Sequence, residues 1–139
     1  MNQHLDHLAF LAAEIVPAEA LLQDDTGFTI VTPEGDLHFF ATGQASAYCR
    51  TRIASLNETQ CPDSFAEAAL RGNFFWRGTD GATISLNTAE NALYLTDRFD
   101  ANAFEDADAF RAYADGFMRT LFDWRARLET ALEGKEAQA

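Results

Sequence analysis

The feature that most constrains this chain is a long, one-sided apolar pattern in its last third. Seven apolar residues recur there at steps of three and four: Phe110, Ala114, Phe117, Leu121, Trp124, Leu128 and Leu132. This is the period of an amphipathic α-helix, which buries one stripe and leaves the other side in water. Arg and Asp alternate at four-residue spacing from Arg111 to Arg127, as expected for a solvated helix face. We therefore predict a helix that begins near Asp106 and ends at Gly134.

Two shorter helices are predicted upstream. Apolar residues recur at helical spacing from His4 to Ile15, and Pro17 ends that pattern. Ser64 and Glu67 have the spacing of a capping box, in which both side chains satisfy free backbone N–H groups at a helix start. The second helix should therefore begin at Ser64 and run to about Phe75.

The segments between these helices predict five β-strands. Their β-branched and aromatic residues are bounded by turn residues, and the strands span residues 28–31, 37–41, 48–56, 82–86 and 92–96. The order is α-β-β-β-α-β-β-α, and hairpin-length connections favour an antiparallel five-stranded sheet with the helices packed on one face. Because the chain has 139 residues and is 47% apolar, we expect residues 1–139 to form a single α+β domain.

The charge balance narrows the choice of partners. The chain carries 22 acidic and 10 basic side chains, a net charge of −12, and nine of the ten cations are Arg. Phosphate backbones and anionic membranes are poor partners for such a chain, so we expect no nucleic acid and no membrane insertion. Cys49 and Cys61 have neither zinc nor redox spacing, and no signal-peptide pattern is visible. These features predict reduced thiols and a cytoplasmic location.

Motifs for catalysis, cofactors and metals were sought and not found. Asp25-Thr26-Gly27 is the tripeptide of aspartic proteases, but these are common turn residues and we interpret them as a turn. No nucleophile that His38 would activate is recognisable nearby. The acidic residues between Asp97 and Asp108 lack the ligand spacing of an EF-hand, and there is no phosphate-binding loop, dinucleotide fingerprint or nucleophile elbow. We predict a protein that is not an enzyme, with no cofactor and no metal.

More apolar residues are present than one core needs. The strand residues expected to face the helices are Phe28, Ile30, Leu37, Phe39, Ile53, Ile84, Leu86, Leu93 and Leu95. Period-two alternation then sends Val31, Phe40, Tyr48 and Tyr94 to the other face of the sheet. In the second helix, Leu70, Phe74, Phe75 and Trp76 cover too wide an arc for one stripe. Exposed apolar surface of this kind predicts a homo-oligomer that binds polypeptide.

Three segments carry a resemblance to a known family. They are Leu70-Arg71-Gly72-Asn73-Phe74, the hairpin of Gly81-Ala82-Thr83-Ile84-Ser85-Leu86 with Ala92-Leu93-Tyr94-Leu95, and the aromatic seam from Phe110 through Phe117 to Trp124-Arg125. Together with the element order, size and acidity, they resemble the class I type III secretion chaperones, the Tir chaperone (CesT-like) family of small bacterial cytosolic proteins. The first half of the chain agrees in element order more than in residues.

The resemblance implies a bacterial, cytoplasmic homodimer without catalytic activity. Such a chaperone binds the N-terminal segment of a secreted effector and keeps it soluble, non-globular and secretion-competent. The resemblance places the dimer interface at Leu70, Phe74, Phe75 and Ile84. It places effector binding at Val31, Phe40, Tyr48 and Tyr94, with Leu8 on the first helix.

Two other interpretations remain open from the sequence. One is a YbjN-like protein-interaction domain, which shares the architecture but acts outside secretion. The other is a small ligand-binding α+β protein, which predicts a defined cavity with converging polar groups. The chaperone interpretation predicts instead a closed core with apolar patches on the outside.

Overall fold

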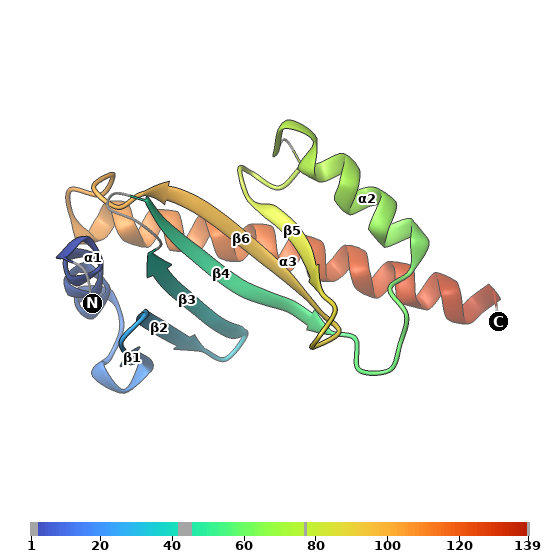
Figure 1. Cartoon of the computed structure of the whole chain (residues 1–139), viewed down its shortest axis with the longest axis horizontal. Coiled ribbons are helices and arrows are strands. Elements are labelled where there is room, and N and C mark those ends of the chain that lie inside the picture. Colours follow the sequence, from blue (N-terminus) through green and yellow to red (C-terminus); the bar gives the residue numbers. More distant parts are fainter. Residues whose placement is uncertain (1–2, 42–45, 77, 139) are drawn as a thin grey trace. The chain divides into compact units, whose positions relative to one another are not determined.

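The computed structural model describes residues 3–41, 46–76 and 78–138, which form three α-helices and a β-sheet (Figure 1). The helices are α1 (Gln3–Ile15), α2 (Asp63–Asn73) and α3 (Ala107–Gln138), with short 3-10 turns η1 (Ala18–Ala20) and η2 (Phe74–Trp76). The strands are β1 (Leu21–Gln23), β2 (Gly27–Thr32), β3 (Gly35–Ala41), β4 (Ser46–Ser55), β5 (Thr83–Asn87) and β6 (Ala92–Asp100).

The predicted α+β class and antiparallel sheet are confirmed, but the sheet has six strands instead of five, in the order β1-β2-β3-β4-β6-β5. The strand missing from the prediction is β1, which has three residues and pairs with β2, with Leu22 opposite Thr29. Three residues are too few for a period-two pattern, so only pairing with β2 reveals the strand.

A tight turn connects β1 to β2. The Asp24 carboxylate accepts hydrogen bonds from the backbone N–H groups of Thr26 (2.8 Å) and Gly27 (2.9 Å) and from the Thr26 hydroxyl (2.7 Å). The Thr26 hydroxyl, followed by the two backbone groups, lowers the pKa of Asp24. Gly27 must lack a side chain, because a Cβ there would lie 1.9 Å from the carbonyl oxygen of Phe39. The interpretation of Asp25-Thr26-Gly27 as a turn is thus confirmed.

The chain forms two compact units, which we describe separately. The first unit comprises Met1–Thr51 with Thr96–Gly116, and the second comprises Arg52–Leu95 with Phe117–Ala139. Strands β4 and β6 and helix α3 each contribute residues to both units.

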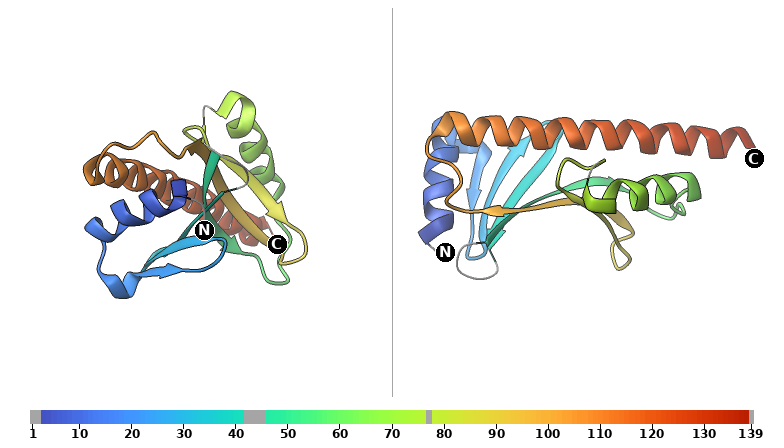
Figure 2. Two further views of the ribbon diagram at one scale, coloured as in Figure 1. Left: turned by 60° about the vertical axis from the view of Figure 1, so that its left-hand side comes forward. Right: turned by 90° about the horizontal axis from the view of Figure 1, so that it is seen from above.

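The core of the first unit lies between α1, the β2–β3 hairpin and the start of α3. Helix α1 contacts β2 and β3 (Figure 2) and buries the predicted stripe of Leu5, Leu8, Leu11 and Ala12. The rings of Phe28 and Phe39 stack with centroids 4.8 Å apart, and Phe110 of α3 packs on Phe39 at 5.3 Å. Aromatic contacts between strand and helix therefore replace the disulfides or metal that a smaller core would need.

A partly buried polar pair lies beside this aromatic core. The Tyr113 hydroxyl of α3 donates a hydrogen bond to the Asp97 carboxylate of β6 at 2.5 Å. Burial, followed by the neighbouring Cys49 and the contact with Asp97, raises the pKa of Tyr113 well above its usual range. Burial also raises the pKa of the free Cys49 thiol, which is fully buried. Cys49 is therefore a core side chain with no thiolate character at neutral pH.

The core of the second unit is centred on Trp124. This ring is fully buried, meets Phe65 of α2 edge-on at 5.8 Å and donates from Nε1 to the carbonyl of Gly78 at 3.1 Å. The neighbouring Arg125 donates from Nε to the carbonyl of Ile53 and from Nη2 to that of Arg52, both at 2.9 Å. The Trp-Arg pair thus fixes α3 to both α2 and β4 within this unit.

Two helix boundaries differ from the prediction. Helix α2 begins at Asp63 after Pro62, without a side-chain cap, so the capping box of Ser64 and Glu67 is wrong. Pro62 supplies the first helical carbonyl instead, bonded by the N–H of Ala66 at 3.0 Å. Helix α3 continues past Gly134 to Gln138, because one exposed Gly costs a helix only about 1 kcal/mol.

Candidate binding surfaces

One face of the β3–β4 pair in the first unit carries a row of stacked side chains. Phe40 lies opposite Tyr48, and His38 lies opposite Arg50. The Phe40 and Tyr48 rings are 5.2 Å apart and within 12° of parallel, and the His38 ring also stacks on Phe40, with centroids 5.3 Å apart. The Arg50 guanidinium lies over Phe40, 5.3 Å from its centroid. We call His38, Phe40, Tyr48 and Arg50 the aromatic row.

His38 is held in this row as a neutral side chain. Its Nδ1 lies 3.0 Å from the Thr29 hydroxyl on β2. Burial lowers the pKa of His38, and the charge of Arg50 lowers it further. The imidazole therefore extends the row as a third ring.

The first unit exposes other apolar side chains near α1, but they are not all the predicted ones. Val31 is exposed as predicted, whereas Leu8 is 0% exposed, so Leu8 is wrong as a surface residue. Leu8 lies within the buried helical stripe and supports the core. Phe10, 64% exposed, is the large apolar side chain that α1 presents to solvent. Leu22 of β1 is also exposed. Phe10 lies outside the buried apolar stripe of α1, and this position in the helical repeat is the sequence signal for its exposure.

In the second unit, the predicted site residue Tyr94 lies in a polar cluster. Its hydroxyl donates to the Glu90 carboxylate and accepts a hydrogen bond from Arg52 Nη2 at 3.3 Å. The Arg52 guanidinium also lies 5.8 Å from the centroid of the Tyr94 ring and 3.9 Å from Glu90. Tyr94 is half-buried among these groups and does not form an apolar patch.

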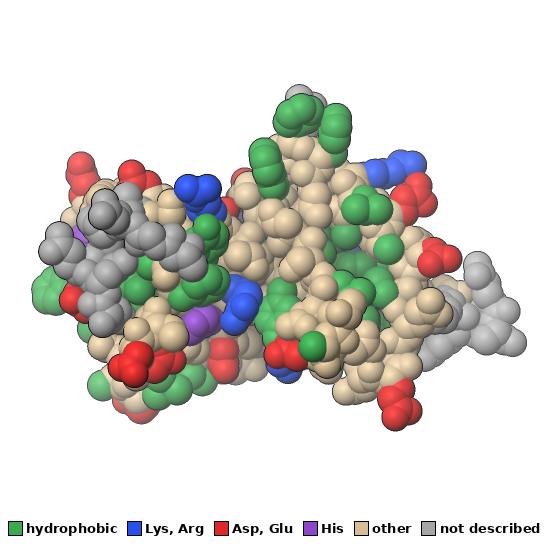
Figure 3. Space-filling model, viewed as in Figure 1, with side chains coloured by type: hydrophobic (Ala, Val, Ile, Leu, Met, Phe, Trp, Pro, Cys, Tyr) green, Lys and Arg blue, Asp and Glu red, His purple; other side chains and the backbone are tan. Residues whose placement is uncertain are grey.

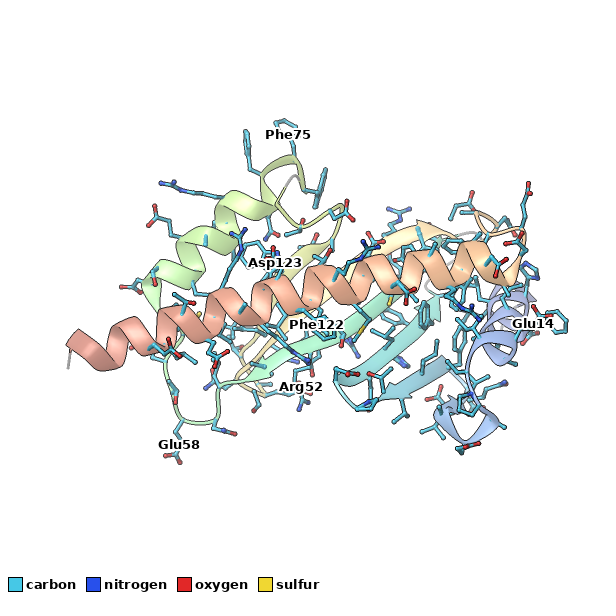
Figure 4. All side chains as sticks on the ribbon, turned by 180° about the vertical axis from the view of Figure 1, so that it is seen from behind. Glu14, Arg52, Glu58, Phe75, Phe122 and Asp123 are labelled. Carbon is cyan, nitrogen blue, oxygen red and sulfur yellow. The ribbon has the colours of Figure 1, made fainter. Side chains whose placement is uncertain are left out.

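The largest exposed aromatic group lies at the end of α2. Phe74 and Phe75 are 67% and 70% exposed, and Leu70 and Trp76 are exposed with them. Phe75 points outward from the turn after α2 (Figure 4), and hydrophobic side chains gather at this end of the unit (Figure 3). Phe75 and Trp76 have φ of 52° and 57°, in the left-handed region that non-glycine residues rarely adopt. We call Leu70, Phe74, Phe75 and Trp76 the aromatic tip.

Strand β5 lies beside this tip, and its predicted interface residue is not exposed. Ile84 is only 7% exposed, as expected for a strand residue that faces the helices, so its side chain belongs to the core of the monomer. The Asn73 side chain pairs with its backbone: Nδ2 donates to the Ile84 carbonyl at 3.1 Å, and Oδ1 accepts from the Ile84 N–H at 3.0 Å. Leu86, predicted to be inside, is instead 46% exposed at the end of β5 next to the turn. Along β5, the side chains that face the core are therefore buried at Ile84 and exposed two residues later, at Leu86.

Two hollows lie on the surface of the second unit. One, of about 480 Å³, lies between residues 60–64 and the stretch from Thr130 to Gly134, and Asp63 is the one carboxylate of its lining. A neighbouring hollow of about 360 Å³ is lined mainly by Ala and other small side chains. The first hollow is lined by polar side chains that include Gln60, Asp63, Ser64 and Thr130, and the second includes the paired Asp123 and Arg127.

Within residues 3–41, 46–76 and 78–138, no three His, Cys, Asp or Glu side chains are grouped so as to hold a metal ion. Among these described residues, no helix has both the length and the apolar character required to cross a bilayer.

The fold and its exposed aromatic groups define a class: a small α+β domain with surfaces suited to protein–protein contact. The sequence matches the Tir chaperone protein (CesT) family over residues 16–125, and the chain belongs to that family. The resemblance seen in the sequence is thereby confirmed. No curated protein sequence matches the chain.

Solved structures share the fold at low sequence identity. A chain in the crystal structure of the ExsC–ExsE complex is similar with a TM-score of 0.72 and 11% identity, over 92% of this chain and 97% of that one. The Yersinia pestis type III secretion chaperone SycH, in complex with a stable fragment of YscM2, has a TM-score of 0.64 and 15% identity, over 91% and 99% of the two chains. The HopA1–SchA chaperone–effector complex gives 0.60 and 10%, over 88% and 97%. These likenesses establish the common fold.

Proposed function

We propose that this protein is a type III secretion chaperone that binds the N-terminal segment of a secreted effector. It keeps that segment soluble, non-globular and secretion-competent. The observation that carries the proposal is membership of the Tir chaperone protein family over residues 16–125. Similar folds in a type III secretion chaperone and in a chaperone–effector complex support it.

The aromatic row gives an effector segment a place to bind. A segment in extended form presents alternate side chains, which pack on flat, pre-stacked rings such as those of Phe40 and Tyr48 at little cost in side-chain entropy. The edges of the sheet offer backbone hydrogen bonds, and the edge strands are β1 and β5. Asn73 already occupies both backbone groups of Ile84 on β5. Strand addition is therefore expected at β1, close in sequence to the exposed Val31.

The aromatic tip is the proposed contact between two copies of the chain. Leu70, Phe74 and Phe75 are its predicted members, with Ile84 as the buried support beneath them and Leu86 as a further exposed neighbour. Left-handed backbone at a non-glycine residue costs about 1–3 kcal/mol and persists where other interactions offset it. Phe75 and Trp76 adopt this conformation, and both side chains are exposed. Burial of the aromatic tip in a homodimer interface would offset the cost of this backbone conformation.

The remaining properties follow from the same proposal. The protein acts in the bacterial cytoplasm, carries out no catalysis, and needs no cofactor for binding. A net charge of −12 keeps a complex with unfolded cargo in solution by mutual repulsion.

The proposal is tested by co-expressing the chain with each secreted protein encoded beside it in the genome. We expect one of these proteins to co-purify, with its N-terminal segment protected from protease. Light scattering of the chain alone should give about twice 15.4 kDa. A monomer that retains none of these proteins would reject the proposal.

A further inference from the structure

The outer face of the sheet in the first unit is unusual for its charge. The chain has 22 acidic and 10 basic side chains, yet two exposed arginines stand on this face, Arg50 on β4 and Arg98 on β6. Arg98 donates to the Ser46 hydroxyl from Nε at 3.2 Å and from Nη2 at 2.9 Å. Ser46, Tyr48 and Arg50 alternate along β4 and therefore share one face. Arg98 thus adds a second cation to the face that already carries Arg50 of the aromatic row.

Both guanidinium groups are held in position by the protein. The Arg50 guanidinium lies 5.3 Å from the centroid of the Phe40 ring, a cation–π contact that holds the cation beside this ring. Arg98 is oriented by two hydrogen bonds to one hydroxyl. A cation that is already oriented loses less entropy when it binds a carboxylate.

Three acidic side chains lie near this face. One is Asp24, in the turn before β2, which is close enough to His38 to raise its pKa against the larger effects of burial and Arg50. Asp36 precedes His38 by two residues on β3, and Asp100 follows Arg98 by two residues on β6. His38, between the arginine and the aromatic rings, is neutral at pH 7 and adds no charge. A hollow of about 340 Å³, lined by Ser46, Arg98, Phe99 and Asp100, opens beside the second arginine. The middle of the face therefore combines apolar rings with positive charge and has room for a side chain next to Arg98.

We propose that this face selects effector segments in which carboxylates alternate with apolar side chains. The inference rests on the proposed function and adds the chemistry of the cargo. Apolar side chains of the segment pack on Phe40 and Tyr48, and its Asp or Glu side chains pair with Arg50 and Arg98. The net charge of −12 has the opposite effect on cargo preference, because at long range it attracts basic segments and repels acidic ones. The two effects predict opposite cargo, so an experiment separates them.

The test uses fluorescein-labelled synthetic peptides with identical apolar positions and with Glu, Gln or Lys at every other position. Anisotropy titrations are run with the full-length protein in 50 mM and 500 mM NaCl. An exposed ion pair changes an equilibrium by about 1.4- to 5-fold. We expect the Glu peptide to bind about three- to tenfold more tightly than the Gln peptide in low salt, since two pairs contribute. The preference should shrink in high salt, because exposed charges are screened.

The variants are Arg50→Gln, Arg98→Gln and the double variant, with Arg71→Gln as the matched control. Arg71 is an exposed arginine of α2 in the second unit, paired with Glu67. The double variant should bind Glu and Gln peptides equally, whereas Arg71→Gln should keep the wild-type preference. Circular dichroism melts check that each variant is folded. Tighter binding of the Lys peptide, or an unchanged preference in the double variant, would overturn the inference.

Failure of this inference is distinguishable from failure of the proposed function. If the co-expressed effector binds the double variant as tightly as the wild-type protein, the inference is wrong and the chaperone function stands. The same conclusion follows if the effector binds but none of the peptides does. If no effector is retained by the wild-type protein, the proposed function itself fails.

Discussion

Gly72 of α2 lies directly against the ring of Trp124, so close that a Cβ on Gly72 would stand 2.7 Å from Cζ2 and 3.0 Å from Cη2. Gly78 approaches Gly72 equally closely, because its own added Cβ would lie 2.8 Å from the Gly72 Cα. The absence of two side chains thus allows the helix, the following loop and the Trp124 ring to meet in one place.

We expect Gly72→Ala to destabilise the protein by about 1–3 kcal/mol, the usual cost of overpacking a filled core. Denaturant unfolding followed by fluorescence would measure the change. Gly116→Ala is the matched control, because nothing lies within 4 Å of an added Cβ there. That variant should be neutral or more stable by up to about 1 kcal/mol, through helix propensity alone. Equal destabilisation by both substitutions would contradict the packing described here.

The proposed dimer predicts that Phe74→Asp combined with Phe75→Asp yields a folded monomer. Both side chains are exposed in the single chain, so the introduced carboxylates should leave the monomer folded. Burial of the same carboxylates between two copies would be unfavourable and should prevent dimerisation. Sedimentation velocity would measure the oligomeric state. Phe122→Asp is the control, since Phe122 is an exposed aromatic residue on α3 in the same unit but outside the tip (Figure 4). A double variant that still sediments as a dimer would exclude the tip as the interface.

Removal of the Tyr113 hydroxyl should weaken the first unit. Tyr113→Phe takes the 2.5 Å donor away from the Asp97 carboxylate while leaving the ring in contact with Phe99 and Phe104. The loss of a hydrogen bond to a partly buried charged group costs about 1–3 kcal/mol. Tyr48→Phe removes a hydroxyl from a tyrosine of the aromatic row and should change the unfolding free energy much less. Two equal effects would show that the contact with Asp97 adds no stability.

His38 should titrate below the ordinary histidine pKa of about 6.5, because burial and the charge of Arg50 both disfavour its protonation. The unfolded chain then binds a proton at a higher pH than the folded protein, so the wild-type protein loses stability as pH falls through about 6.5. Relative to His38→Gln, this loss should appear between pH 7 and 5. NMR titration of the imidazole measures the pKa directly, and Arg50→Gln should raise it. A His38 midpoint at or above the ordinary value would contradict the burial of this ring in the row.

The sequence predicts most of the helices and strands because their periodic patterns are long. The stripe from Phe110 to Leu128 is buried as expected, and its centre, Trp124, is the core of the second unit. The wide apolar arc of α2 likewise predicted the exposure of Phe74 and Phe75. Strand β1 escaped prediction because three residues carry no period.

Site residues were harder to predict, because exposure depends on partners distant in sequence. Leu8 and Phe10 are an exception, because their helical phase, which is local in the sequence, already separates the buried Leu8 from the exposed Phe10. Ile84 is paired by Asn73, eleven residues earlier, a contact that strand alternation does not encode. The stacking of His38, Phe40, Tyr48 and Arg50 depends on the β3–β4 register, which the chain fixes only on folding.

The contact between Asn73 and Ile84 also bears on how copies of the protein avoid aggregation. A sheet edge with free N–H and C=O groups is a template on which another chain can grow, and a protein that handles unfolded cargo meets such chains constantly. The Asn73 amide stands in for a neighbouring strand at Ile84 and closes this position of the β5 edge from within the same chain. Sheets of two copies therefore cannot join through Ile84 into a growing fibre, and uncontrolled polymerisation is blocked there by a single side chain.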